Sequence, residues 1–191
     1  MRRLTLASTS TYRRALLARL GVPFEVASSD VDETPRNGEA PRDRAVRLAQ
    51  AKAQTVAARS GGVVIGSDQV ASREGRLLRK PHTFENAREQ LLGSSGCQVE
   101  FHTAVCIVDA ENDASHALLD HTTVRFRILA VDEVERYLAF EQPFDCAGAF
   151  KCEGAGISLF EAIDNRDPTA LIGLPLIGVS AVLRTLGWRL P

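Results

Sequence analysis

The segment GGVVIGSDQV, residues 61–70, says most about the fold. Its two glycines end a preceding helical pattern, and Val63 to Ile65 form a short apolar run that is typical of a buried strand. We expect this strand to end at Gly66 and to carry Asp68 at its tip. Carboxylates at the strand ends of an α/β sheet face the crevice in which ligands bind.

Outward from this segment, strand-like and helix-like patterns alternate along the chain. The expected strands are Leu4–Ala7, Phe24–Ala27, Val63–Gly66, Gln98–Asp109, Leu118–Leu129 and Ile157–Ile163. The expected helices are Tyr12–Leu20, Pro41–Arg59, one that starts at Thr83 or Glu85 and reaches Leu92, Asp132–Phe140 and Pro175–Leu186. This order predicts an α/β protein with a mixed sheet flanked by helices. No repeat or linker interrupts residues 1–191, so we expect a single domain, or two lobes around one cleft.

The composition excludes several classes of protein. The chain has 191 residues with 45% hydrophobic content, enough for a real core, and its net charge is −1, from 23 basic and 24 acidic residues. Because the charges balance, the chain has no overall positive field that would attract nucleic acid or an anionic membrane surface. No apolar stretch approaches the ~18 residues of a membrane span. The four cysteines lack metal or redox spacing, which favours thiols in a reducing cytoplasm.

The first candidate site is the turn after the first strand. Ser8 and its neighbouring hydroxyl residues lead into a helix N-terminus, where free N–H groups and the helix dipole favour an anion. Arg13 and Arg14 add guanidinium groups that suit phosphate oxygens. The alternative is that the hydroxyls are ordinary N-caps and the arginines are solvated.

The second candidate is acidic. Glu33 lies in a polar loop and Asp68 follows the most apolar strand, so two carboxylates from separate segments could hold Mg²⁺ or Mn²⁺. Lys52, among alanines on a helix, and Lys80, before Pro81, could neutralise phosphate charge. Each of these residues alone also fits a solvated loop or an ordinary surface lysine, so the prediction depends on their combination.

Seven motifs in order carry a resemblance. They are S-x-S-x-x-R-R near the start, D-E before a proline, A-x-K-A, G-S-D-Q-V, K-P, C-A-G-A-F-K-x-E-G-x-G-I and D-x-T-A-L-I-G-L-P-L. Together they span Leu6 to Leu186 and resemble the Maf nucleotide pyrophosphatases, which share an architecture with the inosine-triphosphate pyrophosphatases. The resemblance implies a two-lobed mixed α/β fold with the active site in a central cleft, and a homodimer.

The resemblance also implies roles for individual residues. Asp68 matches the catalytic acid/base position. The phosphate and metal site corresponds to Ser8, Arg13, Glu33, Lys52 and Lys80, and Arg14 extends it. The positions that set base specificity correspond to Tyr12, Gln69 and Glu153. The forms around Gln69 and Glu153 are similar to the branch that acts on 7-methyl-GTP, although that branch often carries Pro-Trp where this chain has Thr11-Tyr12.

These expectations give a hypothesis for function. Glu33 and Asp68 hold the divalent metal, Asp68 activates water, and Arg13, Lys52 and Lys80 neutralise the triphosphate, which is cut to a monophosphate and pyrophosphate. Two alternatives stay open. One is a pyrophosphatase for dTTP, UTP or modified pyrimidine nucleotides, and the other is a nucleotide-binding regulator of cell division without turnover.

Overall fold

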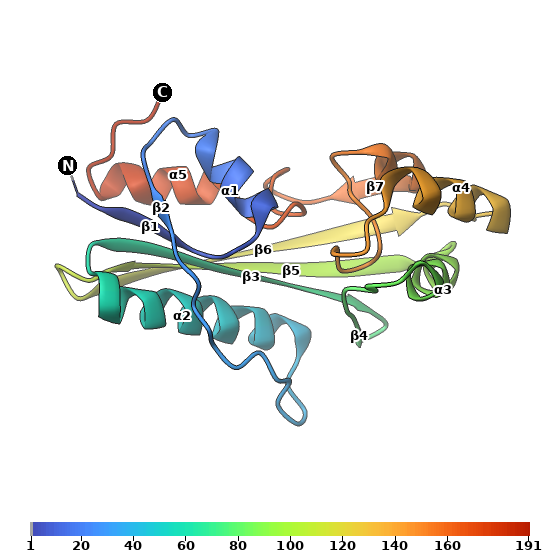
Figure 1. The fold of residues 1–191 in the computed structure, drawn as a ribbon, viewed down its shortest axis with the longest axis horizontal. Coiled ribbons are helices and arrows are strands. Elements are labelled where there is room, and N and C mark those ends of the chain that lie inside the picture. The colour runs from blue at the N-terminus through green and yellow to red at the C-terminus, as the bar shows by residue number, and fades with distance from the viewer. Residues whose placement is uncertain (1) are drawn as a thin grey trace. The chain divides into compact units, whose positions relative to one another are not determined.

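A computed structural model describes residues 2–191 of the chain (Figure 1). The strands are β1 (Leu4–Ala7), β2 (Glu25–Val26), β3 (Val63–Arg73), β4 (Arg76–Leu78), β5 (Gln98–Asp109), β6 (Ala114–Phe126) and β7 (Phe160–Asp164). The helices are α1 (Thr11–Ala18), α2 (Pro41–Ser60), α3 (Phe84–Ser94), α4 (Val131–Glu141), the 3₁₀ helix η1 (Ala155–Leu159) and α5 (Leu176–Thr185). No helix in this described range is both long enough and apolar enough to cross a lipid bilayer.

The seven strands form one mixed sheet, as the alternating pattern predicts. The strand order is β2-β1-β3-β5-β6-β7, with β4 paired to β3. β1 is parallel to both β2 and β3, whereas the β3–β4 and β6–β7 pairs are antiparallel. The described chain divides into two compact units. Unit 1 comprises residues 2–69, 102–120 and 167–191, and unit 2 comprises residues 70–101 and 121–166.

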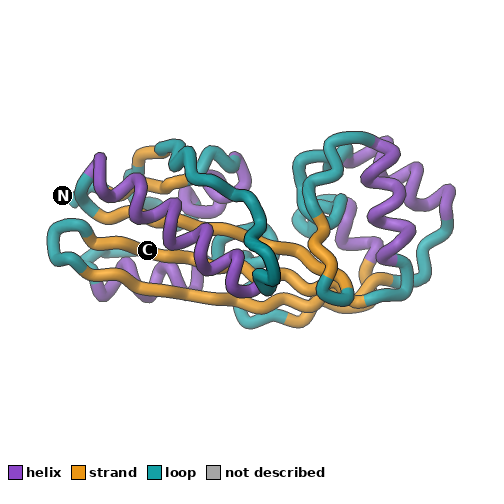
Figure 2. Tube along the Cα trace, turned by 90° about the horizontal axis from the view of Figure 1, so that it is seen from below, coloured by secondary structure: helices purple, strands orange, loops and turns teal. Residues whose placement is uncertain are grey.

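Unit 1 is built in layers on β1, β2 and the parts of β3, β5 and β6 that fall in residues 63–69, 102–109 and 114–120. Figure 1 shows α2 on one face, with α1 and α5 on the opposite face, and Figure 2 shows α2 lying along the strands. Strand alternation explains the two faces. Val63 and Ile65 pack in the core with α1 and α5, whereas Val64 packs with Val56 and Ala57 of α2.

Unit 2 has its own aromatic core. Phe150 contacts Phe101, Phe126 and Phe160 edge-on, with ring centroids 4.8–5.7 Å apart. Such edge-to-face pairs add about 0.5–1.5 kcal/mol each beyond the area they bury. Helices α3 and α4 pack together in this unit. The segment between α4 and η1 therefore carries a central core residue, Phe150.

Three expectations about element bounds are wrong. β3 continues through Arg73, because Glu74 and Gly75, both with positive φ, form a two-residue hairpin turn into β4. β6 begins at Ala114, four residues before the predicted start. The expected strand Ile157–Ile163 is a 3₁₀ helix up to Leu159, and β7 begins at Phe160. Asp68 consequently lies within a strand and not at its tip.

Candidate active site

The centre of the candidate site is an ion-pair cluster in unit 1. Nζ of Lys52 lies 2.7 Å from Oδ1 of Asp68 and 2.6 Å from Oε1 of Glu33. Lys52 and Asp68 are each only 7% exposed, whereas the Glu33 side chain is more than half exposed. The carboxylates are thus neighbours, joined by one ammonium group, as the pairing of these residues in the sequence hypothesis requires.

A glycine lets α2 approach β3 closely enough to form this cluster. A Cβ on Gly66 would lie 2.4 Å from the carbonyl oxygen of Ala49 and 2.5 Å from the amide nitrogen of Ala53. Gly66 and Asp68 are two residues apart and share the face of β3 that α2 covers. Lys52 extends from the same stretch of α2, so close backbone contact places its ammonium group against Asp68.

The surroundings of Asp68 in this cluster shift the pKa of its carboxyl group. Burial raises the pKa of the Asp68 carboxyl above its usual range, while Lys52 and Arg13 oppose that rise by stabilising the charged form. A carboxylate with a raised pKa is a better proton acceptor near neutral pH. The combination of burial and specific charged partners is typical of catalytic carboxylates, although structural ion pairs show it too.

Arg13, in the first turn of α1, is subject to the negative charges of Asp68 and Glu33. Ser10 caps the helix, its hydroxyl accepting a hydrogen bond from the backbone N–H of Arg13 at 3.3 Å. The side-chain Nε of Arg13 donates to the carbonyl of Gly173 at 3.0 Å. Burial lowers the pKa of the Arg13 guanidinium, opposed by the charges of Asp68 and Glu33. Its two terminal amino groups are suited to bidentate binding of phosphate oxygens.

The other predicted residues of this turn have different surroundings. The buried hydroxyl of Ser8 accepts a hydrogen bond from the backbone N–H of Ser10 at 3.1 Å. Tyr12 is half-buried on α1. Arg14 is exposed and lines a separate hollow together with Phe24 and Val26. Arg13 and Arg14 are adjacent in sequence, but the helix directs only the first toward Gly173.

Gln69 is held by a hydrogen-bond network on the opposite face of β3 from Asp68. Its Nε2 donates toward Oγ1 of Thr103 at 2.9 Å and toward the carbonyls of Ala170 and Leu171 at 3.0 Å. Thr103 in turn donates to the Ala170 carbonyl. Three acceptors surround an amide nitrogen with two hydrogens, so this orientation of the amide is set by its partners.

The remaining predicted residues belong to unit 2. Lys80 is exposed and follows β4. Glu153 is exposed, next to Cys152, whose thiol pKa is raised to about 12 mainly by burial. The segment before Glu153 is fixed by α4. The Tyr137 hydroxyl accepts from the backbone N–H of Lys151 at 3.0 Å, and Nζ of Lys151 donates to the Glu141 carbonyl at 3.0 Å.

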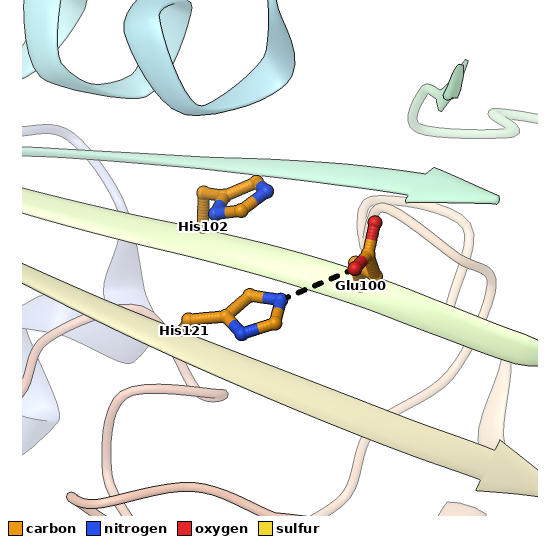
Figure 3. Close-up of side chains that lie close together, drawn as sticks. All are labelled: Glu100, His102 and His121. Carbon is orange, nitrogen blue, oxygen red and sulfur yellow. Dashed lines mark ion pairs between the residues drawn. The ribbon is translucent and has the colours of Figure 1, made fainter. Parts of the chain in front are cut away.

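Two strands also bring a histidine beside a carboxylate, which histidine spacing in the sequence does not predict. Nε2 of His121 on β6 lies 3.4 Å from Oε1 of Glu100 on β5 (Figure 3). Both side chains are 48% exposed, and exposed ion pairs contribute about 0–1 kcal/mol. The pair therefore adds little to stability.

Sequence reasoning assigned no role to several residues of the network in unit 1. These are Ser67, Thr103, Asp167, Thr169 and Gly173. Ser67 donates to the Gly173 carbonyl at 2.9 Å, the same oxygen that accepts from Arg13. The segment Asp167–Pro175 belongs to the last of the seven sequence motifs, but none of its residues was given a role. Its polar residues were the available signal, because buried Asp and Thr side chains require hydrogen-bond partners.

Comparison with known proteins identifies the family of the chain and several similar proteins. A family model described as Maf-like protein matches residues 3–186. A 7-methyl-GTP pyrophosphatase from Xanthomonas axonopodis pv. citri is 56% identical over 192 residues, covering 100% of both chains. A protein of the same name from Burkholderia orbicola is 52% identical and covers 98% of this chain and 91% of its own length.

Among solved structures, the chain resembles a HAM1 protein from Coxiella burnetii. The TM-score is 0.50 at 15% sequence identity, with 97% of this chain and 100% of the other chain covered. At that identity the likeness concerns the fold alone. It supports the expected α/β fold with a mixed sheet.

Proposed function

Because the chain belongs to the Maf-like protein family, we propose that it is a nucleoside triphosphate pyrophosphatase that hydrolyses 7-methyl-GTP to 7-methyl-GMP and pyrophosphate. The structural observation that carries the proposal is the Glu33–Lys52–Asp68 cluster with Arg13 in its field. Relatives that are 52–56% identical over nearly their whole length are named 7-methyl-GTP pyrophosphatases, which supports the same substrate.

The reaction joins a water oxygen to the α-phosphorus and breaks the bond from that phosphorus to the oxygen bridging to the β-phosphate. Asp68 takes the proton of the attacking water, a role that its raised pKa favours. Lys52 keeps Asp68 oriented through their 2.7 Å contact. Arg13 binds the phosphates and neutralises the charge that develops on the leaving pyrophosphate, and Lys80 of unit 2 is proposed to assist.

The donor set of Glu33 and Asp68 fits a divalent cation. Both are carboxylates, their oxygens surround one ammonium group, and Mg²⁺ commonly uses one or two protein carboxylates together with substrate phosphates. When bound, Mg²⁺ or Mn²⁺ would supply charge neutralisation and a lower pKa for coordinated water. Glu33 is the more exposed of the two carboxylates.

Base recognition is assigned to Tyr12, Gln69 and Glu153. A 7-methylguanine ring is cationic, so the face of Tyr12 would attract it by about 0.5–2 kcal/mol. The carboxylate of Glu153 would accept the N–H donors of the Watson–Crick edge. Since the amide nitrogen of Gln69 is used by Thr103 and two carbonyls, its Oε1 is the atom available to a base donor.

A substrate panel tests this proposal. Purified protein is given 7-methyl-GTP, GTP, UTP and dTTP with Mg²⁺ and with Mn²⁺, and both pyrophosphate and free phosphate are measured. We expect pyrophosphate from 7-methyl-GTP, and a loss of about 10²–10⁴-fold in Asp68→Asn. Asp32→Asn, which changes an exposed carboxylate beside Glu33, is the matched control and should retain activity.

Two other outcomes of the substrate panel would support the alternative functions. Preferred turnover of UTP and dTTP would replace the proposed substrate with a pyrimidine nucleotide. Nucleotide binding without pyrophosphate release would support a regulator that binds without turnover. Glu153→Gln should reduce 7-methyl-GTP use far more than UTP use, and equal losses would show that Glu153 does not read the base.

A further inference from the structure

The segment Asp167–Pro175, which we call the Gly173 loop, presents one carbonyl to two side chains of the candidate site. The Gly173 oxygen accepts from Nε of Arg13 at 3.0 Å and from Oγ of Ser67 at 2.9 Å. Gly173 has φ +123°, and a Cβ there would lie 3.3 Å from Nε of Arg13. Glycine is therefore required at this position both by its backbone conformation and by the closeness of the arginine.

A buried pair of side chains closes this loop from within. The hydroxyl of Thr169 accepts from the backbone N–H of Leu176 at 2.8 Å and lies 2.7 Å from Oδ1 of Asp167 and 2.8 Å from the Leu174 carbonyl. Oδ2 of Asp167 accepts from the backbone N–H of Ile177 at 2.6 Å. Asp167 is 4% exposed and Thr169 is 7% exposed, so these bonds form away from water.

The other side of the loop is attached to the sheet. Thr103 of β5 donates to the Ala170 carbonyl at 3.0 Å, and Gln69 of β3 donates to the carbonyls of Ala170 and Leu171. Gly173 thus lies between a segment bonded to the sheet and a segment bonded to the start of α5. With both sides fixed, its carbonyl has little freedom to move.

We propose that Thr169 is a positioning residue that acts through Gly173 on Arg13. By joining the Leu174 carbonyl to the start of α5, its hydroxyl fixes the turn that contains Gly173, and the Gly173 carbonyl fixes the direction of the Arg13 guanidinium. One of the three nitrogens of Arg13 is held by protein, which leaves both terminal amino groups for phosphate oxygens. The inference rests on the proposed function for the assignment of Arg13 to phosphate.

A double-mutant cycle tests the inference with Thr169→Val, Arg13→Ala and the combined variant. A displacement of about 1 Å in a group that contacts the reacting phosphate can cost about 10²-fold. We expect Thr169→Val to lower kcat/KM by about 10- to 100-fold in wild-type background. In the Arg13→Ala background the same change should lower it by less than about 2-fold, because the residue through which Thr169 acts is gone.

Three further variants control for structural damage. Thr169→Ser keeps the hydroxyl and should restore most of the lost activity. Thr5→Val removes another buried threonine hydroxyl of unit 1, one with no hydrogen-bond partner in the described chain, and should leave activity unchanged. If Thr169→Val does not fold, Gly173→Ala replaces it in the cycle, since its Cβ would crowd Arg13 directly.

The cycle is measured twice, by turnover and by calorimetric binding of inorganic pyrophosphate. Equal fold-losses of Thr169→Val in both Arg13 backgrounds would overturn the inference, because Thr169 would then act independently of Arg13. If the protein binds pyrophosphate but hydrolyses no nucleotide, the proposed function fails while the binding cycle still decides the inference. Failure of Arg13→Ala to weaken pyrophosphate binding would overturn the inference by itself.

Discussion

Removing the ammonium group of Lys52 should destabilise the fold in a strongly pH-dependent way. Lys52→Met keeps most of the buried stem but leaves Asp68, 7% exposed, without its 2.7 Å partner. Breaking a buried pair by removing one member typically costs about 3–5 kcal/mol, because the remaining charge is left uncompensated. Arg13 still offsets part of that cost, and Asp68 avoids the rest by binding a proton.

Protonation sets an upper limit on the loss. An unfolded Asp has a pKa of about 3.9, so holding Asp68 neutral in the fold costs about 1.36 kcal/mol for each pH unit above that value. The limit is about 4.2 kcal/mol at pH 7 and about 1.5 kcal/mol at pH 5. The sign follows from linkage: the folded variant binds more protons than the unfolded chain, so its stability falls as pH rises.

Urea unfolding of wild type and Lys52→Met, followed by far-ultraviolet circular dichroism at pH 5 and pH 7, measures this effect. We expect the difference in unfolding free energy to be about 3–4 kcal/mol at pH 7 and to shrink by more than half at pH 5. Lys80→Met changes an exposed lysine and should stay within about 0.5 kcal/mol at both values. A loss in Lys52→Met that is equal at the two pH values would refute the electrostatic reasoning and point to packing.

Three other predictions concern single groups. Gly66→Ala should lower the free energy of unfolding by at least about 1–3 kcal/mol, since the new Cβ would lie 2.4 Å from the Ala49 carbonyl; an unchanged urea midpoint would contradict this contact. Tyr137→Phe should cost about 1–3 kcal/mol by leaving the backbone N–H of Lys151 without its acceptor, as thermal or urea unfolding would report. The acidic limb of the pH–kcat/KM profile should reflect a pKa above 3.8, because burial raises the pKa of Asp68 and the ionised form is active; a flat acidic limb would exclude Asp68 as the base.

Local patterns predicted most elements but failed where tertiary pairing extends them. The helix Pro41–Ser60 was predicted within one residue at its end, because Pro at the start and Gly61-Gly62 after it are local signals. β3 was predicted to stop at Gly66, yet it continues to Arg73. At its end, Ala71, Ser72 and Arg73 are strand because they pair with β4, which no local pattern indicates.

The chain sequence alone was sufficient for the α/β class, for the succession of helices and strands apart from β4 and η1, and for the set of charged residues that form the cluster in unit 1. These features depend on local propensity, periodicity and motif order, which are properties of the linear sequence. The tertiary structure decided which groups meet. Lys52 meets Asp68 because Gly66 lets α2 approach β3 closely, and Arg13 meets Gly173, which is far away in the chain. Burial, shared hydrogen-bond acceptors and the resulting pKa shifts depend on distances in space, and no local pattern of residues specifies those distances.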